Sequence, residues 1–338
     1  MEFHNISVIV QGTVDENITS KCLKSVRKYL PDAEIVLASY IDTNTNDLDF
    51  DKLALVEDPG FYPYNKQANA KPNNINRQIQ TTLAGLKAAA RKYAFKLRSD
   101  FIINGCGFID FFNQFPKSDP EYKIFEEKLL SCTCFARNPR DDKNNFAHHP
   151  SDIAFFGLRS DLLNLFNLPL MSKEDFEYME RKGYNLSRFV PEQYLWISCL
   201  RKNGKIINCD NYLHINKLLV EETEHYFVSN FIFLDYEQFN LVPPKRLTLF
   251  SENDFNSIIT HIEWQRLYKQ YIDNTHQAPE KNELRDSITA KYKKLKKLKN
   301  IRIYTFIVRI ITIPIRIRSI RHKLREKLIR YMTKDIHI

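Results

Sequence analysis

The chain has 338 residues, 43% of them hydrophobic, and carries 50 Lys and Arg against 41 Asp and Glu, a net charge of +9. This length and apolar content support one large folded domain or two smaller ones, and they exclude a wholly disordered chain. Eight Gly and 14 Pro exclude collagen-like and low-complexity classes, and because no run approaches the roughly 20 apolar residues that span a bilayer, we expect no integral membrane protein.

Strand and helix patterns alternate over the first hundred residues. Short apolar runs predict strands at Ile6–Val10, Glu34–Ser39, Lys52–Val56 and Tyr93–Leu97. One helix is expected to be capped by Thr19 and stopped by Pro31, and another to begin at Asn73 or Asn74. This alternation is typical of an α/β open sheet with parallel strands.

Polar residues follow several of these expected strands directly. In an open α/β sheet, ligands bind outside the carboxyl ends of the strands. Gln11 and Gly12, Asp58, and Asp100 all come at such ends, so we expect them around one crevice. No GxGxxG or P-loop pattern occurs in the sequence.

The second half of the body has a less regular pattern. A strand is expected at Ala154–Gly157, strands also at 206–213 and 227–234, and helices at 160–166, from Pro191, and within 247–271. Because no convincing linker precedes residue 280, residues 1–280 are interpreted as one domain.

The C-terminal 49 residues differ sharply from this body. Residues 290–338 hold 16 Lys and Arg and two acidic residues, whereas the first 289 residues hold 34 basic and 39 acidic ones. Amphipathic basic patterns at 291–299 and 321–332 flank an apolar run, Ile301–Ile315, that Pro314 interrupts. We therefore expect residues 281–338 to form a basic amphipathic tail whose segment 290–338 docks on an anionic membrane surface. The alternatives are packing of Ile301–Ile315 on the body and, less expected, binding of nucleic acid.

The cysteines and the N-terminus favour a cytoplasmic protein. Six Cys are scattered without a paired CxxC spacing, which predicts reduced thiols. Cys132 and Cys134 lack the matching second pair of a zinc site. The first residues show neither a basic region nor a cleavage site of a secretory signal.

Several ordered blocks of the sequence are similar to a known family. They are Ile6–Gly12, Lys21–Pro31, Glu57–Gly60, Asn74–Gln78, Leu83–Lys87, Lys96–Asp100, His149–Asp152 with Phe156–Gly157, and Pro191–Tyr194. Together they resemble the WavE lipopolysaccharide-synthesis family of bacteria from Ile6 to about Leu200. The family is similar to GT-A glycosyltransferases, so the resemblance implies a GT-A-like, Rossmann-type open sheet in the domain 1–280.

The resemblance also implies a function. It indicates a glycosyltransferase, expected to be a hexosyltransferase, that moves a sugar from a nucleotide-sugar donor, expected to be a UDP-sugar. The acceptor would be a lipid-linked or oligosaccharide precursor of lipopolysaccharide, capsule or a related surface glycan. Such an enzyme would work peripherally on the cytoplasmic face of the bacterial inner membrane. The alternatives are a nucleotidyltransferase of sugar metabolism and a non-catalytic scaffold that binds glycan or RNA.

The resemblance implies a metal site after the fourth expected strand. GT-A enzymes place an acidic DxD element there, and hard cations such as Mg²⁺ or Mn²⁺ take oxygen ligands. Here the element is Arg98-Ser99-Asp100, so Asp100 is the expected carboxylate ligand and Arg98 could contact the diphosphate. His214 is a candidate further partner. The alternative is an ordinary Asp100 paired to Arg98.

Two further groups of residues are candidates for binding the nucleotide. Asn74, Asn76, Arg77 and Gln78 stand at a helix N-terminus, where backbone amides and the helix dipole favour phosphate. The family fold places the nucleoside at Gln11, Gly12 and Thr13, and Asp58 is a candidate for hydrogen bonding to uracil or ribose. Ordinary helix capping and turn formation are the alternative roles.

An inverting transfer also needs a carboxylate that takes the proton of the attacking hydroxyl. Glu192 begins a helix, and Asp152 precedes a strand beside His148 and His149. Both are candidate catalytic bases, and a structural carboxylate is the alternative for each. A retaining enzyme would need no such base.

Overall fold

The structure is a computed structural model that describes residues 1–63, 72–141, 145–184, 186–244 and 257–279, and after residue 305 the positions 306–308, 312, 324–325 and 327–328. The chain divides into two compact units. The first comprises Met1–Pro244 and Asn256–Pro279, and the second comprises Lys245–Phe255 and Glu280–Ile338. The fold described below is that of the first unit.

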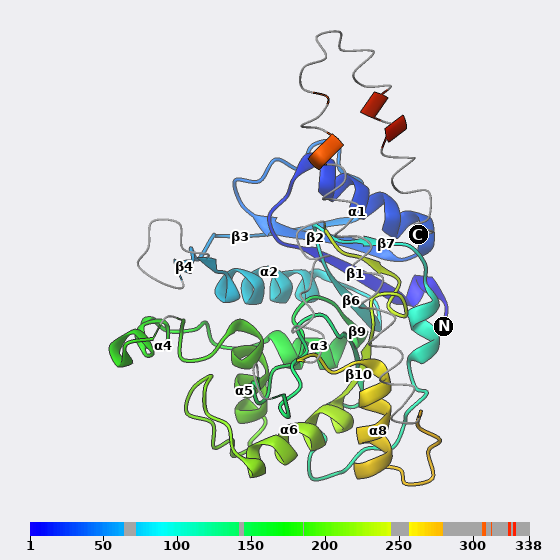
Figure 1. Cartoon of the computed structure of the whole chain (residues 1–338). Helices are drawn as coiled ribbons and strands as arrows, with labels where there is room; N and C mark the ends of the chain where they lie inside the picture. The colour runs from blue at the N-terminus through cyan, green and yellow to red at the C-terminus, as the bar shows by residue number, and fades with distance from the viewer. Residues whose placement is uncertain are drawn as a thin grey trace. The chain divides into compact units, whose positions relative to one another are not determined.

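A seven-stranded sheet forms the centre of the first unit, which confirms a mixed α/β fold (Figure 1). Its strands run in the order β10-β8-β9-β6-β1-β2-β3. Their bounds are β1 Ile6–Gln11, β2 Glu34–Tyr40, β3 Lys52–Val56, β6 Tyr93–Arg98, β8 Leu129–Cys132, β9 Phe155–Leu158 and β10 Phe231–Leu234. All neighbours pair in parallel except β9, which is antiparallel to both β6 and β8.

The strand order reverses at β1, which lies between β2 and β6. The helix after β1, α1 (Glu16–Tyr29), and the helix before β6, α2 (Ile75–Ala88), lie on opposite sides of these strands (Figure 1). Connections that leave in opposite directions open a crevice at the carboxyl ends of the two central strands, the usual ligand site of open α/β sheets. The topology therefore places the candidate site at the ends of β1 and β6.

Local side-chain chemistry sets the start of α1. The Asp15 carboxylate accepts from the backbone N–H groups of Asn17 and Ile18 at 3.0 and 2.9 Å. The expected cap at Thr19 is therefore wrong. Thr19 lies inside the first turn, and its hydroxyl accepts from the N–H of Asp15 at 3.0 Å, which closes the turn reciprocally.

A glycine allows α2 to approach the sheet closely. A Cβ at Gly85 would lie 2.5 Å from Ile9 Cγ2 and 3.1 Å from Ala38 Cβ. Both of those side chains are fully buried on β1 and β2, so neither has room to withdraw. The contact seats α2, and with it the helix N-terminus, over the strand ends that form the site.

Other elements surround the sheet. Two short pairs are antiparallel, β4 (Tyr62–Pro63) with β5 (Pro72–Asn73) and β7 (Ile102–Ile103) with β11 (Leu241–Val242). The remaining helices are η1 Phe3–Asn5, η2 Gly107–Phe111, α3 Arg159–Phe166, α4 Lys173–Glu177, η3 Glu180–Lys182, α5 Pro191–Lys202, α6 Lys217–Asn230 and α8 His261–Tyr271.

Aromatic side chains fill the core on one face of β6 and β9. Phe95 and Phe156 are register partners on the two strands, and both surround Phe108, at ring-centroid distances of 5.0 and 5.3 Å. Because side chains alternate along a strand, Lys96 and Arg98 project to the opposite face. That face is the one on which α2 packs, and Lys96 shares a hydrogen-bond partner with Gln78 of α2, the carbonyl oxygen of Asp152.

The second half differs from the sequence expectations in four respects. Residues 206–213 form turns and irregular backbone rather than a strand, and the run 227–234 is a strand only from Phe231, since α6 continues to Asn230. A short apolar run cannot by itself distinguish a buried helix end from a strand. The sequence pattern predicted neither strand β8 nor the antiparallel direction of β9 relative to its neighbours. Within the expected helical segment 247–271, residues 247–256 lie outside the described residues.

The predicted basic tail lies almost entirely outside the described residues. Where the second unit is described, Phe306 is 64% exposed and Val308 is buried, and Arg325 Nε donates to Thr312 Oγ1 at 2.6 Å. None of the helices in the described part of the chain combines the length and apolar character needed to cross a bilayer.

Candidate active site

The ends of β1 and β6 are joined by hydrogen bonds from Ser99 to main-chain carbonyls. Ser99 N donates to Gln11 O at 3.0 Å, and Ser99 Oγ donates to Thr13 O at 2.7 Å. Gly12 lies between these anchors with φ +119°, a backbone conformation that other residues rarely adopt. The Gly12–Thr13 main chain is therefore held rigidly at the crevice, as an approach surface for a ligand requires.

The Gln11 side chain faces inward. It is 5% exposed, and its Oε1 accepts from the hydroxyl of Thr81 on α2 at 2.9 Å. This contact joins β1 to α2. Of the three residues Gln11, Gly12 and Thr13 that were predicted to meet the nucleoside, Gln11 is placed by the structure in a packing role.

Arg98 and Asp100 form a bidentate ion pair at the end of β6. Arg98 Nε donates to Asp100 Oδ1 at 3.0 Å, and Arg98 Nη2 donates to Oδ2 at 3.1 Å. The side chains are 29% and 17% exposed. This is the paired arrangement that the sequence left open as an alternative. The guanidinium engages both oxygens of the carboxylate that was expected to hold a metal.

The described side chains do not fit a preformed metal site. Both Asp100 oxygens accept from Arg98. His214 Nδ1 accepts from the N–H of Asp210 at 3.2 Å, and its Nε2 lies 3.4 Å from Asn216 Nδ2. Over the described ranges, no group of three or more His, Cys, Asp or Glu side chains is arranged to hold a metal ion. Dependence on Mg²⁺ or Mn²⁺ therefore stays a prediction.

Arg77 and Asp58 meet at the N-terminus of α2. Arg77 Nε donates to Asp58 Oδ1 at 2.7 Å, Nη2 donates to Oδ2, and Nη1 donates to Asn74 Oδ1 at 3.2 Å. The guanidinium lies over the Tyr40 ring at 5.8 Å and the Phe61 ring at 5.0 Å. The Arg77 hydrogen bonds lower the pKa of Asp58. The structure thus joins three predicted nucleotide-binding residues with two rings that the sequence did not single out.

The other two predicted residues of α2 are engaged with main chain. Asn76 is 8% exposed. Its Oδ1 accepts from Met171 N at 2.7 Å, and its Nδ2 donates to Met171 O at 3.0 Å. Gln78 Nε2 donates to Asp152 O at 2.8 Å. Asn76 therefore anchors the segment before α4, and Gln78 links α2 to the turn that carries Asp152.

The two candidate bases lie in one electrostatic cluster. Glu192 stands in the first turn of α5 with its side chain 14% exposed, and its Oε2 lies 3.5 Å from His149 Nε2. Burial raises the pKa of Glu192 to about 8, and the Asp152 charge adds to this rise, whereas Arg137 and Arg98 oppose it. Because burial also lowers the pKa of His149 to about 3, that ring is a neutral neighbour. Glu192 is thus held largely protonated at neutral pH.

Lys96 is a member of this cluster that the sequence reasoning missed. It is fully buried on β6, and its Nζ donates to Asp152 O and Ile153 O. Burial lowers the pKa of Lys96 to about 7. The signal that could have revealed it is a lone lysine inside the apolar run Tyr93–Leu97. Arg137, which also acts on Glu192, lies outside the named strands, where it forms an isolated β-bridge with Ile258, and had no such signal.

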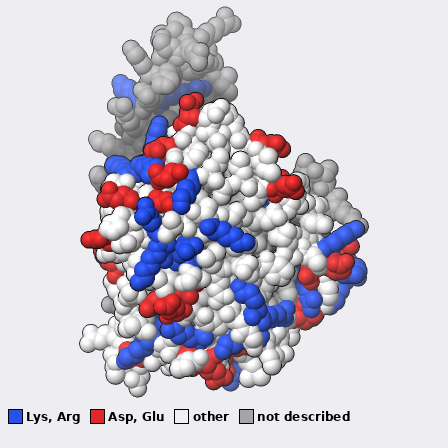
Figure 2. All heavy atoms as spheres, turned by 180° about the vertical axis from the view of Figure 1, so that it is seen from behind, with Lys and Arg blue, Asp and Glu red and all other residues white. Residues whose placement is uncertain are grey.

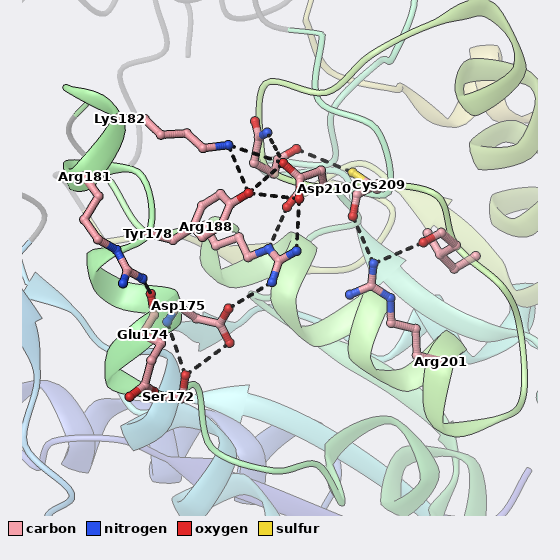
Figure 3. A network of polar contacts seen from close by, with 12 residues as sticks. Ser172, Glu174, Asp175, Tyr178, Arg181, Lys182, Arg188, Arg201, Cys209 and Asp210 are labelled. Carbon is pink, nitrogen blue, oxygen red and sulfur yellow. Dashed lines mark hydrogen bonds and ion pairs between the residues drawn. The ribbon is translucent and has the colours of Figure 1, made fainter.

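His214 contacts Asp210, whose backbone N–H donates to His214 Nδ1. Asp210 is itself the centre of a different, exposed network (Figure 3). The Tyr178 hydroxyl lies 3.0 and 2.8 Å from the two carboxylate oxygens, Arg188 Nη2 donates to Oδ1 at 3.0 Å, and Lys182 Nζ lies 3.5 Å from Oδ2. Three residues separate Arg188 from Glu192, so the network fixes the segment that leads into α5. His214 and Asp100 thus have separate sets of hydrogen-bond partners.

The comparison with protein families now identifies the chain. The family model described as WavE lipopolysaccharide synthesis matches residues 6–299. The chain belongs to the WavE family. No curated protein matches it.

Membership in the WavE family indicates a role in lipopolysaccharide synthesis. The matched region begins at β1 and extends past α8, so it contains every predicted site residue from Gln11 to His214. The WavE match also continues into the predicted basic tail, as far as residue 299.

Proposed function

We propose that this chain is a GT-A-like glycosyltransferase, a hexosyltransferase that uses a UDP-sugar to extend lipopolysaccharide, capsule or a related surface glycan. One observation carries the proposal. Near the carboxyl ends of β1 and β6, where the strand order reverses, Arg98 and Asp100 lie within electrostatic reach of the carboxylates Asp152 and Glu192. Cationic groups suit a diphosphate leaving group, and carboxylates suit the proton of an acceptor hydroxyl.

The donor nucleotide would lie across the ends of β1, β2 and β6. Gly12 and Thr13 offer a fixed main-chain surface for the nucleoside, and the Tyr40 and Phe61 rings offer faces for the base. Asp58 would hydrogen-bond uracil or ribose once Arg77 turns from it toward phosphate. Arg98 would provide the positive charge for the diphosphate, aided by the amide groups at the α2 N-terminus.

The proposed reaction is a displacement at the anomeric carbon of the donor sugar. The acceptor oxygen forms a bond to that carbon while the bond to the diphosphate oxygen breaks and its electron pair leaves with UDP. The acceptor proton passes to a carboxylate, Asp152 or Glu192. Because Glu192 already holds a proton near neutral pH, Asp152 is the base that this structure favours, and Glu192 would donate a hydrogen bond beside it.

A panel of nucleotides tests this proposal. Thermal unfolding would be measured with UDP, GDP and CMP and with their sugars, in Mn²⁺ and in EDTA. We expect UDP and UDP-sugars to raise the melting temperature of the wild-type chain. The thermal shifts of Arg98→Met should correspond to an affinity at least about tenfold lower, since a charge-assisted hydrogen bond is worth about 1.5–3 kcal/mol. If no nucleotide stabilises the wild-type chain, the transferase proposal is wrong.

The same panel decides the source of positive charge. Persistence of UDP binding in EDTA would favour Arg98 as the counter-charge. Loss of binding in EDTA with recovery in Mn²⁺ would favour a divalent ion at Asp100, which requires Arg98 to release at least one carboxylate oxygen. Arg98→Met in both conditions separates the two effects.

We also propose that residues 290–338 hold the enzyme on the inner face of the bacterial inner membrane, beside a lipid-linked acceptor. The support is the excess of 16 basic over two acidic residues in this segment. On the face of the molecule in Figure 2, by contrast, Lys and Arg are interspersed with Asp and Glu. Deletion of 290–338 should abolish sedimentation with liposomes that contain anionic lipid, and equal binding by the truncated chain would overturn this part of the proposal.

A further inference from the structure

A buried lysine amine contacts the main chain of the residue that carries the proposed catalytic carboxylate. Lys96 is fully buried in β6, between Phe95 and Leu97. Its Nζ donates to Asp152 O at 2.5 Å and to Ile153 O at 3.2 Å. Burying an amine is costly, whereas an apolar side chain at this position would preserve the strand. The amine therefore needs a reason beyond packing.

A second side chain reaches the same carbonyl oxygen from another element. Gln78 Nε2, on α2, donates to Asp152 O at 2.8 Å. The rest of this turn is held as well, because Ser151 Oγ accepts from Ile153 N at 3.2 Å and Ala154 O accepts from Cys132 N at 3.3 Å. The main chain that carries Asp152 is thus fixed by α2, β6 and β8 together.

We propose that Lys96 and Gln78 are positioning residues for the Asp152 carboxylate. By holding Asp152 O from two sides, they set the place of the side chain relative to the acceptor hydroxyl and to Glu192. This inference rests on the proposed function. Its physical basis is that a displacement of about 1 Å in a reacting group can reduce turnover about a hundredfold.

The experiment compares two buried lysines. Lys96→Met and Gln78→Met each remove a donor to Asp152 O. Lys128→Met is the matched control, since Lys128 is 6% exposed and also donates to a main-chain carbonyl, that of Lys117. Because β9 is antiparallel to both β6 and β8, strands β6 and β8 run in the same direction. Lys128 immediately precedes β8, so it lies at the amino end of these strands, whereas the site lies at the carboxyl end of β6.

Four quantities are measured for each full-length variant: the melting temperature, the affinity for UDP, and kcat and KM for UDP release. The substrate is whichever of UDP-glucose, UDP-galactose and UDP-N-acetylglucosamine the wild-type chain consumes fastest. For Lys96→Met we expect kcat to fall about a hundredfold with UDP affinity changed less than about twofold. Gln78→Met should lose about tenfold in kcat, because Lys96 still holds the carbonyl. Lys128→Met should lower the melting temperature and leave kcat within about twofold.

Equal kcat values for Lys96→Met and Lys128→Met would overturn the inference, as would a loss of UDP affinity as large as the loss of kcat. If Lys96→Met does not fold, Gln78→Met decides by the same criterion. A wild-type chain that neither binds UDP nor releases it from any of the three donors would overturn the proposed function itself. That result is visible before any variant is made.

Discussion

The carboxylates of Asp210 and Glu192 both have arginines nearby, yet their pKa values shift in opposite directions. Asp210 is 47% exposed in its side chain, and hydrogen bonds from Asn211 and Tyr178, with the charge of Arg188, lower its pKa. Glu192 is 14% exposed, and burial together with Asp152 raises its pKa despite Arg137 and Arg98. Burial therefore outweighs attraction at the site, whereas donated hydrogen bonds dominate at the surface. The raised pKa thus belongs to the buried cluster for which we propose catalytic chemistry.

The largest expected effect comes from removing the proton acceptor. Asp152→Asn should reduce kcat for UDP-sugar turnover by about 10²–10⁴-fold, the usual contribution of a general base, with KM for the donor little changed. Glu192→Gln should cost less, because the amide keeps the hydrogen-bond donor of the protonated acid. A larger loss for Glu192→Gln than for Asp152→Asn would reverse the assignment of the two roles.

The next expected effect is on the pH dependence of stability, and it contrasts the two regions directly. With a folded pKa of about 8 against an unfolded value of 4.5, Glu192 binds a proton in the folded chain that the unfolded chain lacks. Wild-type stability then falls as pH rises through this window. Glu192→Gln has no such loss, so its melting temperature relative to wild type should rise by several degrees between pH 5 and pH 8.

Asp210→Asn should change stability with the opposite pH dependence and by a smaller amount. A lowered folded pKa gives stability that is present above the unfolded value, 3.8, and is lost as pH falls through the folded value. The variant should therefore be less stable than wild type at pH 7, by no more than about 1 kcal/mol for an exposed network, and this difference should shrink below pH 4. Thermal scans from pH 3 to pH 8 measure both variants, and pH-independent differences would contradict the comparison.

Much of the fold could be predicted from local pattern. The strands at the positions of β1, β2, β3, β6 and β9 follow from apolar β-branched or aromatic runs, and α2 follows from its apolar stripe. The pattern misjudged residues 227–230 because Phe227 and Val228 suit a buried helix as well as a strand. It missed β8, whose four residues depend on pairing with β9 and β10.

The candidate site was less predictable, since its residues are identified by what they contact. The position of Asp100 after β6 follows from sequence, and so does its pairing with Arg98 as an alternative to a metal role; the fold shows that pair. Asn76 resembled a phosphate ligand at a helix N-terminus, yet it binds the backbone of Met171, 95 residues away. The Tyr40 and Phe61 rings had no signal in the sequence, and only the fold places them next to the Arg77 guanidinium.

The sequence by itself determined the alternation of strands and helices, the polar residues at strand ends, the family and the charge contrast between body and tail, because these depend on local periodicity and composition. The tertiary structure decided which polar groups are satisfied and which are strained. It buried Lys96 against the main chain of Asp152, 56 residues away, and it placed Glu192 where the Asp152 charge reaches it. Long-range packing sets desolvation and hydrogen-bond partners, and these two quantities determine protonation and therefore chemistry.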